Sequence, residues 1–209
     1  MPSGVAARTI IGMYSFTPCA AGCGRPVLSG CQTCALHSAD PHTESLRIAE
    51  ELSDLEIVKD LNAAHLSFEG VDFSNKKWYG CSFQECTFTR CLFSKSFMRL
   101  CFFDFSHLES CDFSGSDIQF HSFAGSHIRD TSFEGSELIH VNFNGCILEA
   151  CTFSDSDLYN SRFIKARLET VDIIDCNVKK TCFIGSQREH VDFKASNTAE
   201  AIFEAGDPS

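Results

Sequence analysis

The sequence of 209 residues contains no apolar run near the roughly 20 residues that a membrane-spanning helix needs. Its N-terminus also lacks a basic stretch followed by a long apolar one, because the apolar run at residues 10–13 is too short for a signal peptide. We therefore expect a cytoplasmic protein that does not enter a membrane.

Basic residues are in the minority. The chain has 17 Lys and Arg against 28 Asp and Glu, which gives a formal net charge of −11. Neutralising a phosphate backbone requires Lys and Arg side chains. We therefore expect no direct DNA or RNA binding by the main body of the chain, and the Cys-rich N-terminal segment has only Arg25 with which to bind nucleic acid.

The residue constellations of catalysis are also missing. No nucleophile, base and orienting group come together by spacing, and no Gly-rich phosphate loop is present. The sequence therefore predicts a protein that is not an enzyme.

The dominant feature that is present is a period of five. A large side chain, usually Phe, recurs at every fifth residue from Phe68 to Phe203, and two residues before each stands a small one such as Cys, Ser or Ala. This period matches neither the 3.6 of a helix nor the 2 of a strand. It predicts a chain that turns a corner once per unit, which is typical of a solenoid.

This repeat resembles that of the pentapeptide repeat family. The resemblance implies an all-β, right-handed quadrilateral β-helix in which four units make one coil, so residues twenty apart stack on one face. The large positions then sort into two facing Phe stacks and two aliphatic ones. We predict about seven coils over residues 65–205, forming a rod roughly 35 Å long, followed by a tail at residues 206–209.

The 13 cysteines are explained better by their placement than by disulfides. An odd count without a secretion signal favours reduced thiols. Eight fill small inward positions of the repeat, where a thiol acts as a compact hydrophobe, whereas Cys182 points outward. The eight inward residues are Cys81, Cys86, Cys91, Cys101, Cys111, Cys146, Cys151 and Cys176.

The other four cysteines form a module at residues 19–40, after a leader at residues 1–18. Cys19, Cys23, Cys31 and Cys34 provide two close thiolate pairs, and four thiolates would make a closed, structural zinc site. His37 is the alternate ligand, because Cys34-x2-His37 also completes a set with Cys19 and Cys23 that leaves Cys31 out. Free thiols in a loosely ordered leader and a redox-active Cys31/Cys34 pair are the remaining interpretations.

Residues 41–64 change to a helical spacing of apolar residues. Asp40 before Pro41 is a suitable helix start, and Ser53-x2-Glu56 is a capping box at which the segment divides into two helices. We expect this helix to cover the N-terminal end of the rod, whose open edge would otherwise promote aggregation. A membrane or partner helix is the alternative, although its acidic polar face would be repelled by anionic lipid. The apolar positions are Leu46, Ala49, Leu52, Leu55, Val58 and Leu61.

Departures from the repeat mark both ends of the rod. Lys76 takes a small inward position beside Trp78, where we expect an irregular first coil to meet the cap. Arg188 and Thr198 replace large apolar residues in the last coil, as is common in terminal repeats. The backbone edge of that coil predicts a homodimer formed end to end through the C-terminal coil, unless Arg188 and Thr198 keep the chain monomeric.

The outward positions include an acidic ridge beside one corner of the rod. One interpretation is a solvated surface, and the other is an anionic surface that a partner binds. Arg129 interrupts the ridge. Its acidic residues are Glu69, Asp72, Glu109, Asp112, Glu149, Glu169, Asp172, Glu189 and Asp192.

Two functional hypotheses follow. The first is a rigid protein-interaction module that contacts a protein partner through its outward side chains and its zinc-bearing N-terminus. The second comes from the resemblance, since some acidic pentapeptide repeat proteins bind DNA gyrase, a topoisomerase, in place of duplex DNA and protect it from quinolones. This sequence departs from those proteins by its Cys-rich module and by having no evident C-terminal dimerisation helix.

Overall fold

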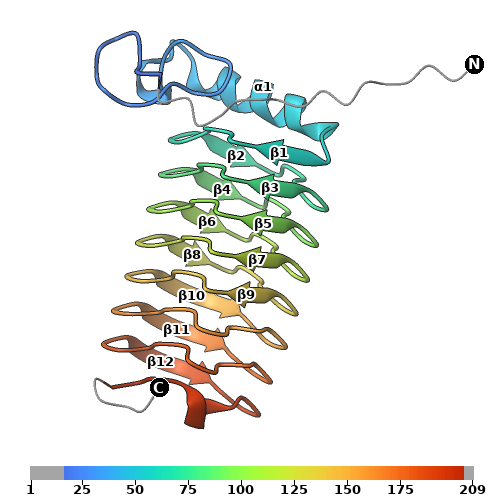
Figure 1. The fold of residues 1–209 in the computed structure, drawn as a ribbon, viewed down its shortest axis with the longest axis vertical. Coiled ribbons are helices and arrows are strands. Elements are labelled where there is room, and N and C mark those ends of the chain that lie inside the picture. Colours follow the sequence, from blue (N-terminus) through green and yellow to red (C-terminus); the bar gives the residue numbers. More distant parts are fainter. Residues whose placement is uncertain (1–16, 205–209) are drawn as a thin grey trace, which may run out of the picture.

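The structure, a computed structural model, describes residues 17–204, so most of the predicted leader and all of the predicted tail lie outside it. It is a β-solenoid of stacked coils with one α-helix across its N-terminal end (Figure 1). The elements are η1 (Ala35–His37), α1 (Pro41–Ser53), β1 (Ile57–Lys59), β2 (Ser67–Glu69), β3 (Lys77–Tyr79), β4 (Thr87–Thr89), β5 (Phe97–Arg99), β6 (His107–Glu109), β7 (Asp117–Gln119), β8 (His127–Arg129), β9 (Glu137–Ile139), β10 (Ile147–Thr152), β11 (Arg167–Asp172), β12 (Gln187–Asp192) and η2 (Thr198–Glu200).

The strands form two parallel sheets on opposite sides of the rod. One has the order β1-β3-β5-β7-β9, and the other has the order β12-β11-β10-β8-β6-β4-β2. Every pairing joins residues twenty apart, for example Phe68 with Phe88 and Trp78 with Met98. Isolated bridges with the same offset, such as Asp72 to Leu92 and Ser82 to Phe102, hold the other two sides. The prediction of a four-unit coil and an all-β solenoid is confirmed.

The core is a set of aromatic ladders. Phe133 is fully buried and stacks on Phe113 and Phe153, with ring centroids 5.1 and 4.9 Å apart. It meets Phe123 and Phe143 of the facing ladder nearly edge-on, at interplanar angles of 82° and 84°. Each ring therefore contacts neighbours above, below and opposite, and side chains fill the interior.

The small inward residues are hydrogen-bond donors as well as space fillers. The hydroxyl of Ser106 donates to the carbonyl oxygen of Phe83 at 2.7 Å, and the thiol of Cys146 donates in the same way to Phe123 at 2.9 Å. Cys86 and Cys176 repeat this bond to a carbonyl 23 residues earlier. Because thiol and hydroxyl satisfy the same buried acceptor, Cys, Ser and Thr are interchangeable at this position.

The rod begins earlier than predicted. Strand β1 pairs Val58 with Trp78, and a bridge joins Asn62 to Ser82, so residues 57–64 belong to the first coil and not to the helix. Helix α1 ends at Ser53, and no second helix starts at the predicted capping box. Leu55, Val58 and Leu61 are spaced three residues apart, which fits a helix as well as a solenoid corner. The pairing of Val58 with Trp78 on the next coil decides for the solenoid.

Helix α1 covers the first coil, as predicted. Asp40 caps its N-terminus by accepting hydrogen bonds from the backbone N–H groups of His42 and Thr43, both at 3.1 Å, and Pro41 follows as the first helical residue. Ile48 and Leu52 are buried against the core of the rod. Leu46, which was predicted to lie on the covered face, is 58% exposed, because the buried stripe runs through Ser45, Ile48 and Leu52.

Lys76 joins the helix to the rod. Its side chain is buried, and its Nζ donates to the backbone oxygens of Ser53 and Leu55 at 3.2 and 2.9 Å. These carbonyls lie at and just beyond the C-terminus of α1, where a cation is favourable. Burial lowers the pKa of Lys76. The expected meeting of the first coil with the cap is thus made by this side chain.

At the opposite end of the rod, strand β12 is the last strand of its sheet among the described residues, and most of its residues are exposed. Arg188 projects there and lies over the ring of Phe203, 4.9 Å from its centroid. Within residues 17–204, no helix is both long and apolar enough to cross a membrane.

Truncation of a mid-ladder ring tests the register of the core. Phe133→Ala should lower the free energy of unfolding by about 3–5 kcal/mol, because stacked coils cannot collapse into the void. The outward Ser114→Ala should change it by less than about 0.5 kcal/mol. Chemical denaturation of both variants measures the difference, and equal losses would show that the register is wrong.

Replacing the capping lysine tests the junction between helix and rod. Lys76→Met keeps the length of the side chain but leaves two carbonyl oxygens without a donor, so the free energy of unfolding should fall by about 1–3 kcal/mol. The exposed neighbour provides the control, since Lys77→Met should be nearly neutral. Thermal or denaturant unfolding that does not distinguish the two variants would contradict the cap.

Candidate metal centre and acidic surface

Four of the five predicted metal ligands come together. Cys19, Cys23, Cys34 and His37 each offer one ligand atom, and these atoms all lie within 4.8 Å of one another. The Nδ1 atom of His37 is 3.6 Å from Cys19 Sγ and 3.5 Å from Cys34 Sγ, and the Sγ atoms of Cys23 and Cys34 are 3.8 Å apart. This is the alternative Cys3His set that the sequence left open.

These distances match the edges of a zinc tetrahedron. With Zn–S bonds of about 2.3 Å and a Zn–N bond of about 2.0 Å, tetrahedral geometry places two sulfurs about 3.8 Å apart and a sulfur and a nitrogen about 3.5 Å apart. A set of three sulfurs and one imidazole nitrogen is typical of structural zinc. These three distances therefore fit a tetrahedral zinc ion, and all four ligand atoms lie within 4.8 Å of one another.

Two tight turns present the ligands. The first carries Cys19 and Cys23 and is closed by hydrogen bonds from Cys19 N–H to Arg25 O and from Gly22 N–H to Cys19 O, both 2.8 Å. Gly22 has a φ of 75°, which L-residues rarely adopt. The second turn is η1, which brings His37 back toward Cys34. The backbone N–H of Cys34 also points at Cys19 Sγ at 3.4 Å and so joins the two turns.

The turn geometry also tunes the thiols. A hydrogen bond with the backbone of Arg25 is the main cause that lowers the pKa of Cys23 to about 6. Burial raises the pKa of Cys34, and its hydrogen bonds with Cys23 and Cys19 raise it further. Metal binding requires thiolates, so an ion at this site would displace protons and be released as the pH falls.

Cys31 lies apart from this group. Its thiol donates to Glu44 Oε2 at 3.2 Å and lies 3.4 Å from an Nη atom of Arg47, so it packs against helix α1. Burial raises the pKa of Cys31, and its hydrogen bond to Glu44 adds to that effect. The structure thus groups His37 with the thiols in place of Cys31, which reverses the first prediction of four cysteines.

The Cys-rich module at residues 19–40 is attached to the rod and to helix α1. The backbones of Ser29 and Asn62 are joined at 2.9 Å, and the Asn62 side chain donates to Val27 O at 2.7 Å. Arg47 of α1 donates to Ser29 O at 2.7 Å. Leu28 and Ala35 are buried in the same core cluster as the first coil. The module and α1 therefore cover the N-terminal end of the rod together.

The acidic ridge is continuous only near the C-terminus. The register stacks Glu149, Glu169 and Glu189 on successive coils, and Asp172 and Asp192 stack beside them across the adjoining corner. We call these five residues the C-terminal acidic run. Toward the N-terminus the two columns are interrupted by Thr89, Arg129, Leu92, Ser132 and Thr152.

Local partners compensate part of the ridge. Glu69 pairs with Arg90, and Glu169 with Arg167 at 2.7 Å, while Glu149 lies 3.4 Å from His127, a pair that is ionic only when the imidazole is protonated. No ion pair of Glu189 is closer than its contact of 4.0 Å with the neighbouring His190 in the part of the chain that the structure describes. The exposed C-terminal end of the run therefore carries the least compensated charge.

Several ridge aspartates also have a structural role. Asp72, Asp112 and Asp192 accept hydrogen bonds from the backbone N–H two residues later, at 2.8, 2.9 and 2.8 Å. Hydrogen bonds from Ser74 lower the pKa of Asp72. These bonds close turns at the corner of the rod. Turn chemistry therefore explains part of the acidic pattern without a partner.

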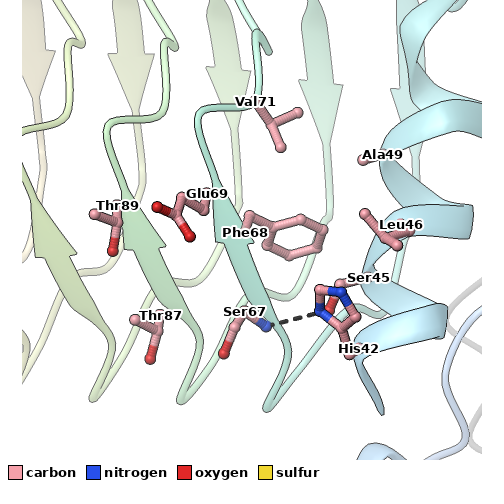
Figure 2. Close-up of a pocket in the computed structure, with 10 residues that line it drawn as sticks. All are labelled: His42, Ser45, Leu46, Ala49, Ser67, Phe68, Glu69, Val71, Thr87 and Thr89. Carbon is pink, nitrogen blue, oxygen red and sulfur yellow. Dashed lines mark hydrogen bonds between the residues drawn. The ribbon is translucent and has the colours of Figure 1, made fainter. Parts of the chain in front are cut away.

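A hollow of about 440 Å³ lies between α1 and the first coils, next to the N-terminal end of the ridge (Figure 2). Leu46 and Ala49 of the helix face Phe68 and Val71 across it, and Glu69 stands at its edge. Its lining also includes His42, Ser45, Ser67, Thr87 and Thr89, so it mixes apolar and polar side chains.

Comparisons with known proteins agree with the coil geometry. The family model described as a pentapeptide repeat region matches residues 126–203, and a second model, of eight pentapeptide repeat copies, matches residues 81–119. Together the two models cover more than half of the chain. The chain belongs to the pentapeptide repeat family. A search of curated proteins finds no match.

A search of solved structures also matches pentapeptide repeat proteins. One is trypsin-treated QnrB1, a plasmid-mediated fluoroquinolone resistance protein, with 14% identity, a TM-score of 0.49, and coverage of 72% of this chain and 83% of that one. Another is HetL, from the cyanobacterium Nostoc sp. strain PCC 7120, with 9% identity, a TM-score of 0.36, and coverage of 75% and 95%. A protein from the Arabidopsis thaliana thylakoid lumen has 27% identity, a TM-score of 0.34, and coverage of 43% and 59%.

Metal content tests the ligand set. Protein purified without chelator should contain about one zinc ion per chain, and Cys34→Ser should remove most of it because a tetrahedral site needs all four ligands. Cys31→Ser provides the matched control and should keep the metal. Elemental analysis of the intact variants measures both, and equal zinc loss in the two would contradict the Cys3His set.

Proposed function

We propose that the protein is a non-enzymatic, rigid protein-interaction module that binds a basic protein surface through its C-terminal acidic run. The observation that carries this proposal is the register that places Glu149, Glu169 and Glu189 on three successive coils with Asp172 and Asp192 beside them. The Cys3His group, holding a structural zinc ion, stabilises the cap at the other end.

The rigidity of the rod supports the proposal. Backbone hydrogen bonds join successive coils on all four sides, and the Phe ladders fill the space between them. A surface on such a scaffold is pre-organised, so little conformational entropy is lost when a partner binds. Binding to a partner therefore depends on the outward side chains.

The electrostatics of the acidic run favour a cationic partner. Carboxylates on neighbouring coils lie about 5 Å apart, close enough to repel one another. Arg167 compensates Glu169, but Asp172, Glu189 and Asp192 are exposed and have no short ion pair within residues 17–204. A basic surface would relieve this repulsion and bring complementary potentials together.

Imitation of duplex DNA is the second candidate function, with gyrase or another topoisomerase as partner. Five carboxylates over two coil spacings, about 10 Å, approach the duplex density of one charge per about 1.7 Å. However, that length corresponds to only about three base pairs, and Arg129 and Thr152 limit the run toward the N-terminus. The short run favours a local basic patch over a DNA-binding groove.

Charge reversal tests the acidic run. The triple variant Glu169→Lys, Asp172→Lys and Glu189→Lys leaves Asp192 in place, because Asp192 closes a turn. Proteins that the native chain captures from extracts of its source cell at low salt should be lost with this variant and on raising the salt concentration, because exposed charges are screened. Circular dichroism and thermal unfolding should show that the rod stays folded.

A control with the same change in net charge is Glu56→Lys, Glu134→Lys and Asp155→Lys, all exposed and outside the acidic run. It should capture the native partners. Identical capture by all three proteins would contradict the proposal. Gyrase supercoiling assayed with each protein at micromolar concentration separates the second candidate, which requires inhibition by the native and control proteins and none by the reversed one.

A further inference from the structure

The sheet opposite the acidic run carries an exposed apolar strip. Phe120 is 54% exposed and Leu100 is 58% exposed, one coil apart at the same corner beside β5 and β7. We call this corner and the outward face of sheet β1-β3-β5-β7-β9 the apolar strip after these two residues, and charged side chains such as Lys77 and Glu137 lie on the same face. Partly exposed apolar or aromatic side chains surround the two residues, namely Tyr79, Phe97, Phe102, Ile139 and Tyr159.

Leu100 and Phe120 occupy corner positions with a left-handed backbone. Their φ values are 54° and 53°, and the other corners of the rod carry Gly, Asn and Asp as well as larger residues such as Arg90 and Phe105. The left-handed region of backbone conformation is sterically unfavourable for large side chains. An aromatic ring that stays in solvent also lacks the stabilisation that its burial would provide. Phe120 stacks on His140, with centroids 4.9 Å apart, but that contact leaves more than half of the side chain in solvent.

Charge is arranged asymmetrically along the same face. The outward column that contains Lys77 and Phe97 continues through Asp117 and Glu137 to Asp157. In this column Lys77 lies two coils before β7, whereas the acidic residues lie on β7 and on the two coils that follow it. A second copy with its rod reversed about β7 would therefore present Asp157 to Lys77.

We infer that the apolar strip binds a second copy of this chain, side by side and antiparallel, with the two-fold axis at Phe120. The symmetry then places Phe120 against its counterpart, Leu100 against His140 and Tyr79 against Tyr159. An isologous interface repeats each such contact twice. A parallel arrangement would not bring Lys77 to Asp157, so this pair favours the antiparallel one, in which Asp117 of each copy also lies near the axis with Arg99 as its neutralising partner.

The charged groups at this interface are free to pair. Lys77 is exposed and makes no ion pair among the described residues. Asp157 uses Oδ1 to accept from Tyr159 N–H and from Asn177 Nδ2, both at 2.9 Å, so these two bonds do not use its Oδ2. Arg99 is already paired with Asp117 at 2.7 Å and stacks 3.6 Å from the centroid of Phe97, so it contributes a flat, neutralised surface.

The size of the strip sets the expected strength. Five strands at about 4.8 Å spacing and a width of about 20 Å give on the order of 400–500 Å² per copy. That is roughly half of the area per partner that a standard stable interface buries, so the dimer should be weak and depend on protein concentration. Lys59 faces Lys179 at the rim, where Glu200 already neutralises Lys179 at 2.8 Å.

Sedimentation and small-angle X-ray scattering of the intact chain over a concentration series test the inference. The native protein should dimerise, and the maximum dimension of the dimer should exceed that of the monomer only slightly. An end-to-end dimer through β12 would nearly double it and would overturn the side-by-side arrangement. A native protein that stays monomeric at the highest soluble concentration would also overturn it.

Two variants locate the interface. Phe120→Asp suits the left-handed backbone and places two carboxylates together at the axis, so it should raise the dimer dissociation constant at least about 100-fold. Phe105→Asp is the matched control, since Phe105 is 63% exposed at a φ of 58° on another corner, over Gly125. Equal effects at the two positions, or none at Phe120, would contradict the interface.

A double-mutant cycle tests the charge pair. Lys77→Glu should raise the dissociation constant about tenfold, because the symmetry repeats the pair. Asp157→Asn keeps the Oδ1 acceptor and should weaken the native dimer but strengthen the dimer of Lys77→Glu. Additive effects would contradict contact between the two residues. The acidic-run triple variant should dimerise normally, which separates this inference from the proposed function.

Discussion

The offset of twenty residues between hydrogen-bonded coils is the constraint on which the rest of the structure depends. It holds in both sheets and in the isolated bridges. Once the offset is set, inward Phe rings stack on one another and most inward hydroxyls and thiols meet a carbonyl 23 residues earlier. The same offset also turns outward residues into columns. The core and the binding surfaces therefore have a single origin.

One register sets both the inward and the outward positions, so the sequence predicts which residues form a surface column. It does not predict which of those residues are compensated by neighbouring side chains. The acidic positions were predictable from the period. Their electrostatic strength was not, since Arg90 reaches Glu69 from a corner position and Asp112 is used to close a turn. The charge that remains available is concentrated at Glu189 and its neighbours, where the shortest ion pair of Glu189 among the described residues is the 4.0 Å contact with His190.

The sequence predicted the solenoid, its four faces and the helical cap, because apolar periodicity reports burial directly. It misplaced the start of the rod, because Leu55, Val58 and Leu61 suit a helix and a corner equally, and only pairing with Trp78 decides between them. It treated inward cysteines as small hydrophobes and missed their donor role, although their alternation with Ser was the available signal.

The candidate metal centre shows a different limit. Spacing identified five residues, but spacing alone could not choose between Cys31 and His37. The choice depends on helix α1, whose Glu44 and Arg47 engage Cys31 on one side while η1 carries His37 to the other thiols. Packing between segments far apart in the chain produces no periodic pattern in the sequence from which it could be predicted. A ligand set with one candidate too many therefore remains undecided until the neighbouring element is placed.

The two proposed surfaces lie on opposite sheets, and this has a consequence for how they would act together. If two rods pack through the apolar strip, the acidic run of each copy faces away from the partner copy, because it belongs to the sheet on the far side. The antiparallel axis also moves the two runs toward opposite ends of the pair. Such a dimer would present two separated acidic sites on one rigid body, and it would bind most strongly to a partner that repeats its basic surface. A monomer would offer one short run, whose few charges are largely screened at physiological salt. Dimerisation would therefore convert a weak electrostatic contact into a bivalent one without adding any residue to the acidic run.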